Sequence, residues 1–259
     1  MNNNPLNQIP LLLSCALCIL LSACGREDVS ARYAVSGFDV SRYQGVVNWD
    51  SVAATGQQFV FIKASEGWNH RDRAFRANWT EAGRAGIRRG AYHFFLPHTS
   101  VERQLSNFID LVKLQPGDLP PVLDVEHRGD LSGPELVAHV RQWLELAEDH
   151  YGVKPILYTG LNFYNRNLAG QFNEYPLWLA RYDDREPVTV CGRPYQFWQY
   201  TNEAAAPGIV GAVDHNVFTG TLAQLDALCV PFPERHPDPL AAGDAVTPLP
   251  NPEPRTFAR

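Results

Sequence analysis

Four acidic residues lie in or at the ends of short apolar segments, where their carboxyl groups could act together on a substrate. Asp124 and Glu126 belong to segment 121–126, and Asp39 and Asp214 lie in two further apolar segments. If 121–126 is a β-strand, residues two apart share one face, which places these two acids about 6.5–7 Å apart. Two carboxyl groups held in this way can hydrolyse a glycosidic bond, one as a protonated acid and the other stabilising charge.

The pKa of Glu126 decides whether it could serve as that acid. A carboxyl group crowded by aromatic side chains and by Asp124 is harder to ionise, so we predict a raised pKa. A single Asp or Glu could equally cap a helix or lie solvated in a loop. Because the acids fall in separate strand-like segments, the pattern favours a carbohydrate-active hydrolase over these alternatives.

Eight segments have the composition of buried β-strands, and helical patterns lie between the early ones. Thr99 and Glu102 have the spacing of a capping box, and Ser132 and Glu135 repeat it with a proline in the first turn. Segment 71–85 is a weaker third helix. The strand segments are 35–41, 59–65, 90–95, 121–126, 155–159, 176–182, 195–201 and 210–218.

This alternation of strands and helices predicts an α/β fold with a parallel sheet. Eight strands in one domain favour an irregular TIM-like (β/α) barrel with about eight strands and fewer than eight helices, since little helix separates the last three strands. In such barrels functional side chains collect at the carboxyl ends of the strands. The predicted fold therefore brings Asp39, Asp124, Glu126 and Asp214 to one end of the barrel.

Composition and charge narrow the class of ligand. The chain carries 22 basic and 28 acidic residues, a net charge of −6, and shows no cluster of Lys or Arg. A nucleic-acid partner needs a basic face, so that class is excluded. The aromatic content of 11%, with six Trp and ten Tyr, suits a site that stacks sugars, although most of these rings are expected in the core.

The amino-terminal segment has the features of an export signal. Residues 11–23 form an apolar run, too short for a membrane-spanning helix, that ends in Leu-Ser-Ala before Cys24. This resembles a bacterial lipobox, although residues 1–10 contain no Lys or Arg. We predict a signal peptide at 1–23, a lipid on Cys24, a tether at 24–34 and anchoring to a bacterial membrane. An ordinary secretory signal is the alternative.

The residue after the lipid-bearing cysteine bears on the destination. Gly25 stands there in place of Asp, which indicates the outer membrane if the cell has one. At the other end, eight of the thirty residues in 230–259 are Pro, a composition that predicts a disordered tail. The catalytic barrel is therefore expected at 35–229.

Cysteine usage agrees with an exported chain. Cys191 and Cys229 are the two cysteines outside the amino-terminal segment, so a disulfide between them is a candidate in an oxidising compartment. Two free buried thiols are the alternative. Neither cysteine has a second Cys or a His pair nearby, so we predict no metal site.

Seven short motifs follow one another along the strand segments. They are GFDVSRYQG (37–45), FIKASEG (61–67), AYHFF (91–95), LDVE (123–126), LWLARY (177–182), QFWQYT (196–201) and VDHNVF (213–218). In this order they resemble the strand motifs of family-25 glycoside hydrolases, the Chalaropsis-type lysozymes or N-acetylmuramidases. Family-18 chitinases instead carry D-x-x-D-x-D-x-E on the fourth strand, and the residues before Asp124 (LPPVL) lack that series of acids.

The resemblance implies a role for each acid. Glu126 would be the general acid, and Asp124 would orient the N-acetyl group whose carbonyl attacks C1, with retention of configuration. Asp39 and Asp214 would shape the electrostatics around that pair. The family needs no metal or cofactor, and a monomer is expected. The aromatic residues expected to line the sugar cleft are Tyr92, Phe94, Tyr158, Trp178, Tyr182 and Trp198.

The leading hypothesis is therefore a membrane-anchored lysozyme that cleaves the β-1,4 bond between N-acetylmuramic acid and N-acetylglucosamine in peptidoglycan glycan strands. A non-catalytic peptidoglycan-binding module is a second possibility, although it would be expected to lack the acids. A hydrolase of another acetamido-sugar polymer is a third, and loop side chains would decide it.

Overall fold

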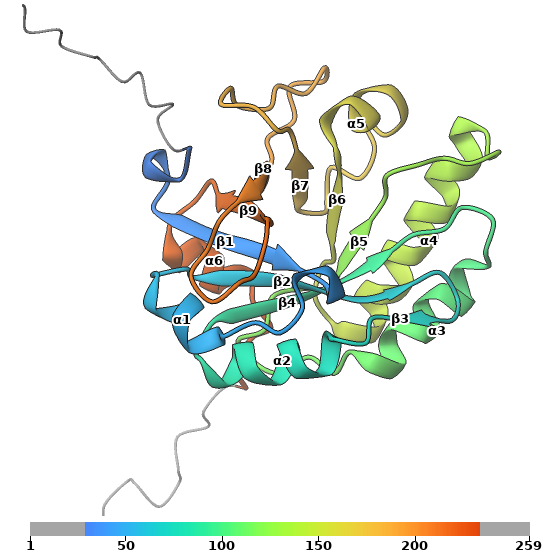
Figure 1. Ribbon diagram of the computed structural model, residues 1–259. Helices are drawn as coiled ribbons and strands as arrows, with labels where there is room; N and C mark the ends of the chain where they lie inside the picture. Colours follow the sequence, from blue (N-terminus) through green and yellow to red (C-terminus); the bar gives the residue numbers. More distant parts are fainter. Residues whose placement is uncertain (1–28, 234–259) are drawn as a thin grey trace, which may run out of the picture.

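The computed structural model describes residues 29–233 (Figure 1). The predicted signal peptide, Cys24 and nearly all of the predicted tail lie outside the described residues. Within them the first strand begins at Val35 and the last helix ends at Leu228. All strands and α-helices of the described residues therefore lie within 35–229, and the 3-10 turn Val29–Arg32 precedes them.

Eight strands form a closed barrel. Strand order in the sheet is β1-β9-β8-β7-β6-β5-β4-β2-β3, and β1 also pairs with β2, which closes the ring and leaves β3 outside it. Figure 1 shows this ring with helices on its outside. The strands are β1 (Val35–Val40), β2 (Phe59–Glu66), β3 (His70–Arg71), β4 (Arg88–Phe94), β5 (Val122–Asp124), β6 (Ile156–Gly160), β7 (Leu177–Ala180), β8 (Phe197–Ala204) and β9 (Val213–Phe218).

One strand runs against the others. From β1 through β2, β4, β5, β6 and β7 to β8 the pairings in the barrel wall are parallel, whereas β9 is antiparallel to both β8 and β1. The connection between β8 and β9 contains no helix, so the chain reverses directly into the next strand. The prediction of an irregular barrel with few helices is confirmed.

Six α-helices lie within the described residues, and their starts follow local side chains. Ser132 caps α4 in a capping box with Glu135, as predicted. The cap of α3 is Ser100 rather than Thr99, because the Ser100 side chain accepts from the Arg103 backbone N–H. The helices are α1 (Trp49–Ala54), α2 (Phe75–Arg84), α3 (Val101–Leu111), α4 (Gly133–Tyr151), α5 (Leu161–Asn167) and α6 (Leu222–Leu228), with short 3-10 turns at Val29–Arg32 and Arg42–Gln44.

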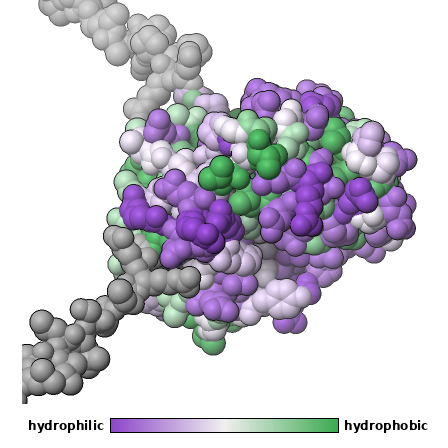
Figure 2. Space-filling view, turned by 90° about the horizontal axis from the view of Figure 1, so that it is seen from above, coloured by the Kyte–Doolittle hydropathy of each residue, from purple (hydrophilic) through white to green (hydrophobic). Residues whose placement is uncertain are grey.

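The described residues include no helix long and apolar enough to cross a membrane. The longest helix, α4, buries one face that includes Trp143 and Leu144 and exposes the other. Seen from above (Figure 2), the surface is hydrophilic over most of its area, with hydrophobic residues gathered near the middle.

Aromatic rings fill the inside of the barrel. Phe61 stacks on Trp178 with ring centroids 4.4 Å apart, and Phe59 and Phe197 pack edge-on against Phe61. Alternate strand residues instead face the helices, where Trp143 is fully buried. Because the strands are buried on both faces, their sequences are continuous apolar runs.

The predicted disulfide is wrong, because both thiols are free. Cys191 is exposed in the connection between β7 and β8, with its Sγ 3.6 Å from the Tyr164 hydroxyl. Cys229 is buried just after α6, where its Sγ donates to the Leu225 carbonyl. The two sulfur atoms are therefore not bonded to each other.

Gly90 on β4 makes the aromatic packing possible, and replacing it by Ala should destabilise the barrel. The new Cβ would lie 2.6 Å from a ring carbon of Phe61, which is fixed by its own stacking. We expect Gly90→Ala to lower the free energy of unfolding by about 1–3 kcal/mol, measured by urea unfolding. Gly133→Ala is the control, since its Cβ would meet nothing within 4 Å. An unchanged midpoint for Gly90→Ala would contradict this packing.

Candidate active site

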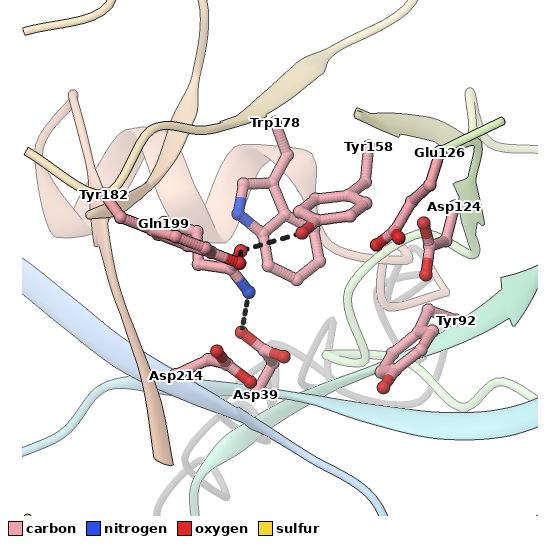
Figure 3. A pocket seen from close by; sticks show the side chains of 9 residues that line it. All are labelled: Asp39, Tyr92, Asp124, Glu126, Tyr158, Trp178, Tyr182, Gln199 and Asp214. Carbon is pink, nitrogen blue, oxygen red and sulfur yellow. Dashed lines mark hydrogen bonds between the residues drawn. The ribbon is translucent and has the colours of Figure 1, made fainter. Parts of the chain in front are cut away.

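All four predicted acids line one pocket at the mouth of the barrel (Figure 3). Asp39 comes from β1, Asp124 ends β5, and Glu126 follows two residues later. Asp214 is the second residue of β9, and because that strand runs antiparallel its beginning lies at the same mouth. The pocket is open to solvent at the mouth and is lined by Asp39, Tyr92, Asp124, Glu126, Tyr158, Trp178, Tyr182, Gln199 and Asp214.

The acids form two pairs on opposite walls. Figure 3 shows Asp124 beside Glu126, and Asp39 beside Asp214 across the pocket. Asp39 and Asp214 are directly opposite each other in the pairing of β1 with β9. A substrate bound between the pairs would therefore meet carboxyl groups on both sides.

Asp39 is buried and held by two amides. Its Oδ2 accepts hydrogen bonds from Gln199 Nε2 at 2.8 Å and from Asn216 Nδ2 at 2.7 Å. Burial raises the pKa of Asp39 well above its ordinary value, and repulsion from Asp214 raises it further. The pKa of Asp214 is also raised by burial, while its hydrogen bond with Asp39 opposes that shift. Asp39 is therefore the member of this pair that is harder to ionise.

Asp124 and Glu126 differ in exposure. Asp124 is buried, and its Oδ1 has no hydrogen-bond partner among residues 29–233. Burial raises the pKa of Asp124 well above its ordinary value, repulsion from Glu126 adds to this, and Lys63 opposes it. Glu126 reaches solvent at the pocket mouth. The protein around it still removes enough water to raise its pKa, again against the attraction of Lys63. The predicted direction of the Glu126 shift is confirmed.

Aromatic residues and Gln199 build the remaining walls. The hydroxyls of Tyr158 and Tyr182 donate to Gln199 Oε1 at 2.7 and 3.0 Å. The amide nitrogen of Gln199 also donates to Asp39, so Gln199 connects both tyrosines to the buried acid through hydrogen bonds. Trp178 is almost fully buried, and its indole N–H donates to Asn216 Oδ1 at 2.9 Å.

Two of the six predicted aromatic residues do not line this pocket. Phe94 lies next to it, with its ring under Lys63 Nζ at 4.8 Å. Trp198 is fully buried on the outer side of β8, where its indole N–H donates to the Arg181 carbonyl. Its neighbours along the strand, Phe197 and Gln199, face inward. The prediction that Trp198 lines the pocket was therefore wrong, and the next residue, Gln199, lines it instead.

Sequence reasoning missed Gln199, Asn216 and Lys63. Gln199 follows Trp198 directly, and Asn216 lies two residues after Asp214, on the same face of β9. Strand alternation was the available signal for both amides. Lys63 on β2 is paired with Glu66 at 2.8 Å and is the cation that acts on both Asp124 and Glu126.

Within residues 29–233 no group of three or more His, Cys, Asp or Glu side chains could hold a metal ion. His93, which follows the pocket residue Tyr92, points away from the pocket. It bonds to Ser65 and Gln104, and burial lowers its pKa to about 4. It therefore supports the packing of β4 and takes no part in the pocket.

Known proteins are similar to this chain in sequence. Residues 38–209 match the model of the glycosyl hydrolases family 25. The chain is 45% identical over 204 residues to the uncharacterized protein YegX of Escherichia coli strain K12, covering 77% of this chain and 75% of the relative. It is 35% identical over 219 residues to lysozyme M1 of Streptomyces globisporus, covering 79% and 73%.

A solved structure agrees with the fold. The family 25 glycosyl hydrolase from Bacillus anthracis superposes with a TM-score of 0.72 at 32% identity, covering 76% of this chain and 94% of that one. The family match over residues 38–209 includes Asp39, Asp124 and Glu126.

Replacing Asp124 by Asn should stabilise the protein at pH 7. The folded-state pKa of Asp124 lies above its unfolded value, so the stability gained from its bound proton is lost as the pH rises through the folded-state pKa. Asn keeps the neutral shape at every pH. Urea unfolding should show the variant more stable at pH 7, with no difference below the ordinary pKa of 3.8.

The matched control for this prediction is Asp130→Asn, at an exposed position outside the pocket. It should leave the urea midpoint unchanged at both pH values. A midpoint for Asp124→Asn below that of the unsubstituted protein at pH 7 would mean that Asp124 is stabilised in its ionised form.

Proposed function

Because the chain belongs to the glycosyl hydrolases family 25 and is a glycoside hydrolase, we propose that it is a lysozyme. It would hydrolyse the β-1,4 bond between N-acetylmuramic acid and N-acetylglucosamine in peptidoglycan. The observation that carries the proposal is the pair Asp124 and Glu126 facing the pair Asp39 and Asp214 across one aromatic-lined pocket. The relationship to lysozyme M1 supports the choice of substrate.

Glu126 is the proposed general acid. Its raised pKa keeps more of it protonated than an ordinary glutamate at the same pH, and its position at the mouth leaves it accessible to the leaving-group oxygen. As the bond from C1 to that oxygen breaks, the Glu126 proton passes to the oxygen. The resulting carboxylate can then take a proton from the water that attacks in the second step.

Asp124 is the proposed partner of the substrate's N-acetyl group. Its buried Oδ1 lacks a hydrogen-bond partner among the described residues, so it can accept the amide N–H. Held in this way, the acetamido oxygen attacks C1 from the face opposite the leaving group. Water later opens the cyclic intermediate from the first face, and the two inversions together retain the configuration at C1.

Asp39 and Asp214 supply negative potential on the opposite wall. Because Asp39 is the harder of the two to ionise, Asp214 is the proposed source of negative charge near the sugar ring, where positive charge develops as the glycosidic bond breaks. Gln199 and Asn216 fix Asp39, so this charge needs little rearrangement during the reaction.

Removing the proposed acid should greatly slow hydrolysis. With purified peptidoglycan, Glu126→Gln should lower the rate at which reducing muramic acid ends appear by about 10²–10⁴-fold, because Gln cannot donate the proton. Glu203→Gln is the matched control, at an exposed position outside the pocket, and should keep the full rate. If the unsubstituted protein released reducing glucosamine ends, it would be a glucosaminidase. If the unsubstituted protein bound peptidoglycan without producing new reducing ends, it would be a non-catalytic module.

The rate should fall as the pH rises through the pKa of Glu126. A general acid must be protonated, and burial holds this pKa above 4.5 while Lys63 lowers it. Lys63→Met removes that attraction, so the alkaline limb of kcat/KM should move to higher pH. Lys113→Met, at an exposed lysine bonded to the Ile109 carbonyl, should leave the profile unchanged. A limb that moves to lower pH in Lys63→Met would exclude this role of Lys63.

We further propose export and anchoring through a lipid on Cys24, in the outer membrane if the cell has one. The apolar run ending at Cys24 supports this. Cys24→Ser should abolish incorporation of labelled fatty acid and release the protein from membranes. Retention of Cys24→Ser in the membrane fraction would refute the anchor.

A further inference from the structure

An exposed aromatic side chain stands beside the pocket without lining it. Trp68 lies at the turn between β2 and β3, and 48% of its surface is exposed. The guanidinium of Arg103, from α3, lies over its ring at 4.5 Å. Cation–π stacking uses one face of the guanidinium and leaves its edge N–H groups directed outward.

The turn that carries Trp68 is held in place by a buried amide. Asn107 donates to the carbonyls of Gly67 and His70 at 3.1 and 3.0 Å, and it accepts from Arg71 Nε at 2.9 Å. Gly67 has a φ of 54°, a conformation that favours glycine. The buried side chain thus fixes a turn whose own Trp remains largely exposed. Such rigid presentation suits a ligand contact better than core packing.

The turn lies on the side of the pocket that holds the proposed acid. Glu66 is level with Phe94 in the pairing of β2 with β4, and Phe94 is level with Asp124 in the pairing of β4 with β5. Two strand spacings therefore separate the end of β2 from Asp124, a distance of about 10 Å. The Gly67 N–H donates to the Phe94 carbonyl, which joins the turn to this rim.

Arg103 also differs from the neighbouring cations in that no acidic side chain of residues 29–233 pairs with it. Lys63 pairs with Glu66 at 2.8 Å, and Arg71 pairs with Asp110 at 3.1 Å. Arg103 makes no ion pair within the part of the chain that the structure describes. The pocket itself gathers four acids and disfavours an anion, whereas the Trp68 turn offers an uncompensated cation.

We propose that Trp68 and Arg103 form a second binding site, for a carboxylate of the peptide that muramic acid carries. This rests on the proposed function. In that substrate the sugar rings are neutral, and the carboxylates sit on a peptide joined to the muramic acid through its lactyl ether. A guanidinium can bind a carboxylate with two parallel hydrogen bonds, and the Trp ring holds it in position. The enzyme would thus favour peptide-bearing glycan over bare glycan.

The test measures binding in the Glu126→Gln background, so that it does not depend on turnover. The probes are soluble glycan oligomers with their stem peptides and the same oligomers after an amidase has removed the peptides. The lactyl carboxylates that the amidase exposes are then converted to amides, so that the bare oligomers carry no charge. Arg103→Gln and Trp68→Ala should each raise Kd for peptide-bearing oligomers about fivefold to tenfold, the loss of one charge-assisted contact. Kd for bare oligomers should not change. Arg76→Gln, at an exposed arginine of α2, is the matched control.

Two further measurements make each outcome decisive. Urea unfolding checks that both variants fold, and Arg103→Lys, which keeps the charge and loses the planar fork, should give an intermediate Kd. An equal loss for both oligomers would make Trp68 a glycan contact and overturn the proposal, as would no loss for either. Hydrolysis by the unsubstituted protein is scored separately, so failure of the lysozyme function is distinguishable from failure of this site.

Discussion

Gathering four carboxyl groups in one partly dry pocket is the constraint on which the rest of the structure depends. Each buried carboxylate loses water and repels its neighbours, so the protein has to lower the total charge or compensate it. It does both. Asp39 has a pKa well above its ordinary value and accepts two amide hydrogen bonds, while the positive charge of Lys63 lowers the pKa of both Asp124 and Glu126. The pocket is therefore poised for proton transfer, at a cost in stability that the aromatic core offsets.

Closure of the barrel is what lets this compensation occur. The partners of Asp39 come from β8 and β9, at the other end of the domain sequence, and reach it because β1 pairs with β9. The interior below the pocket is filled by stacked rings, which excludes water from the floor and fixes Trp178. Glycine at position 90 leaves the space those rings need. The closed fold thus supplies the hydrogen bonds that the buried acid needs.

Much of this could be predicted from the sequence, because the apolar segments and the acids at their ends carry a strong local signal. Which residues of β8 point into the barrel could not be predicted, because the strand is buried on both sides and Phe197 and Trp198 are equally apolar. Gln199 was missed for the same reason. The cysteine pairing rested on a count, and a count says nothing about the distance between two sulfur atoms. The cap of α3 moved by one residue because Thr99 and Ser100 are both good caps.

The antiparallel course of β9 has one more consequence. Asp214 and Asn216 lie on the last strand of the barrel, and both contact Asp39 on the first strand. Asn216 and Asp39 are 177 positions apart in the sequence. A chain that is still being synthesised, or one held unfolded, has no pocket at all, whatever acids it already contains. Catalytic competence is thus tied to completion of the fold. A shortened chain that ends before β9 would be inert, which limits hydrolysis of glycan to intact molecules.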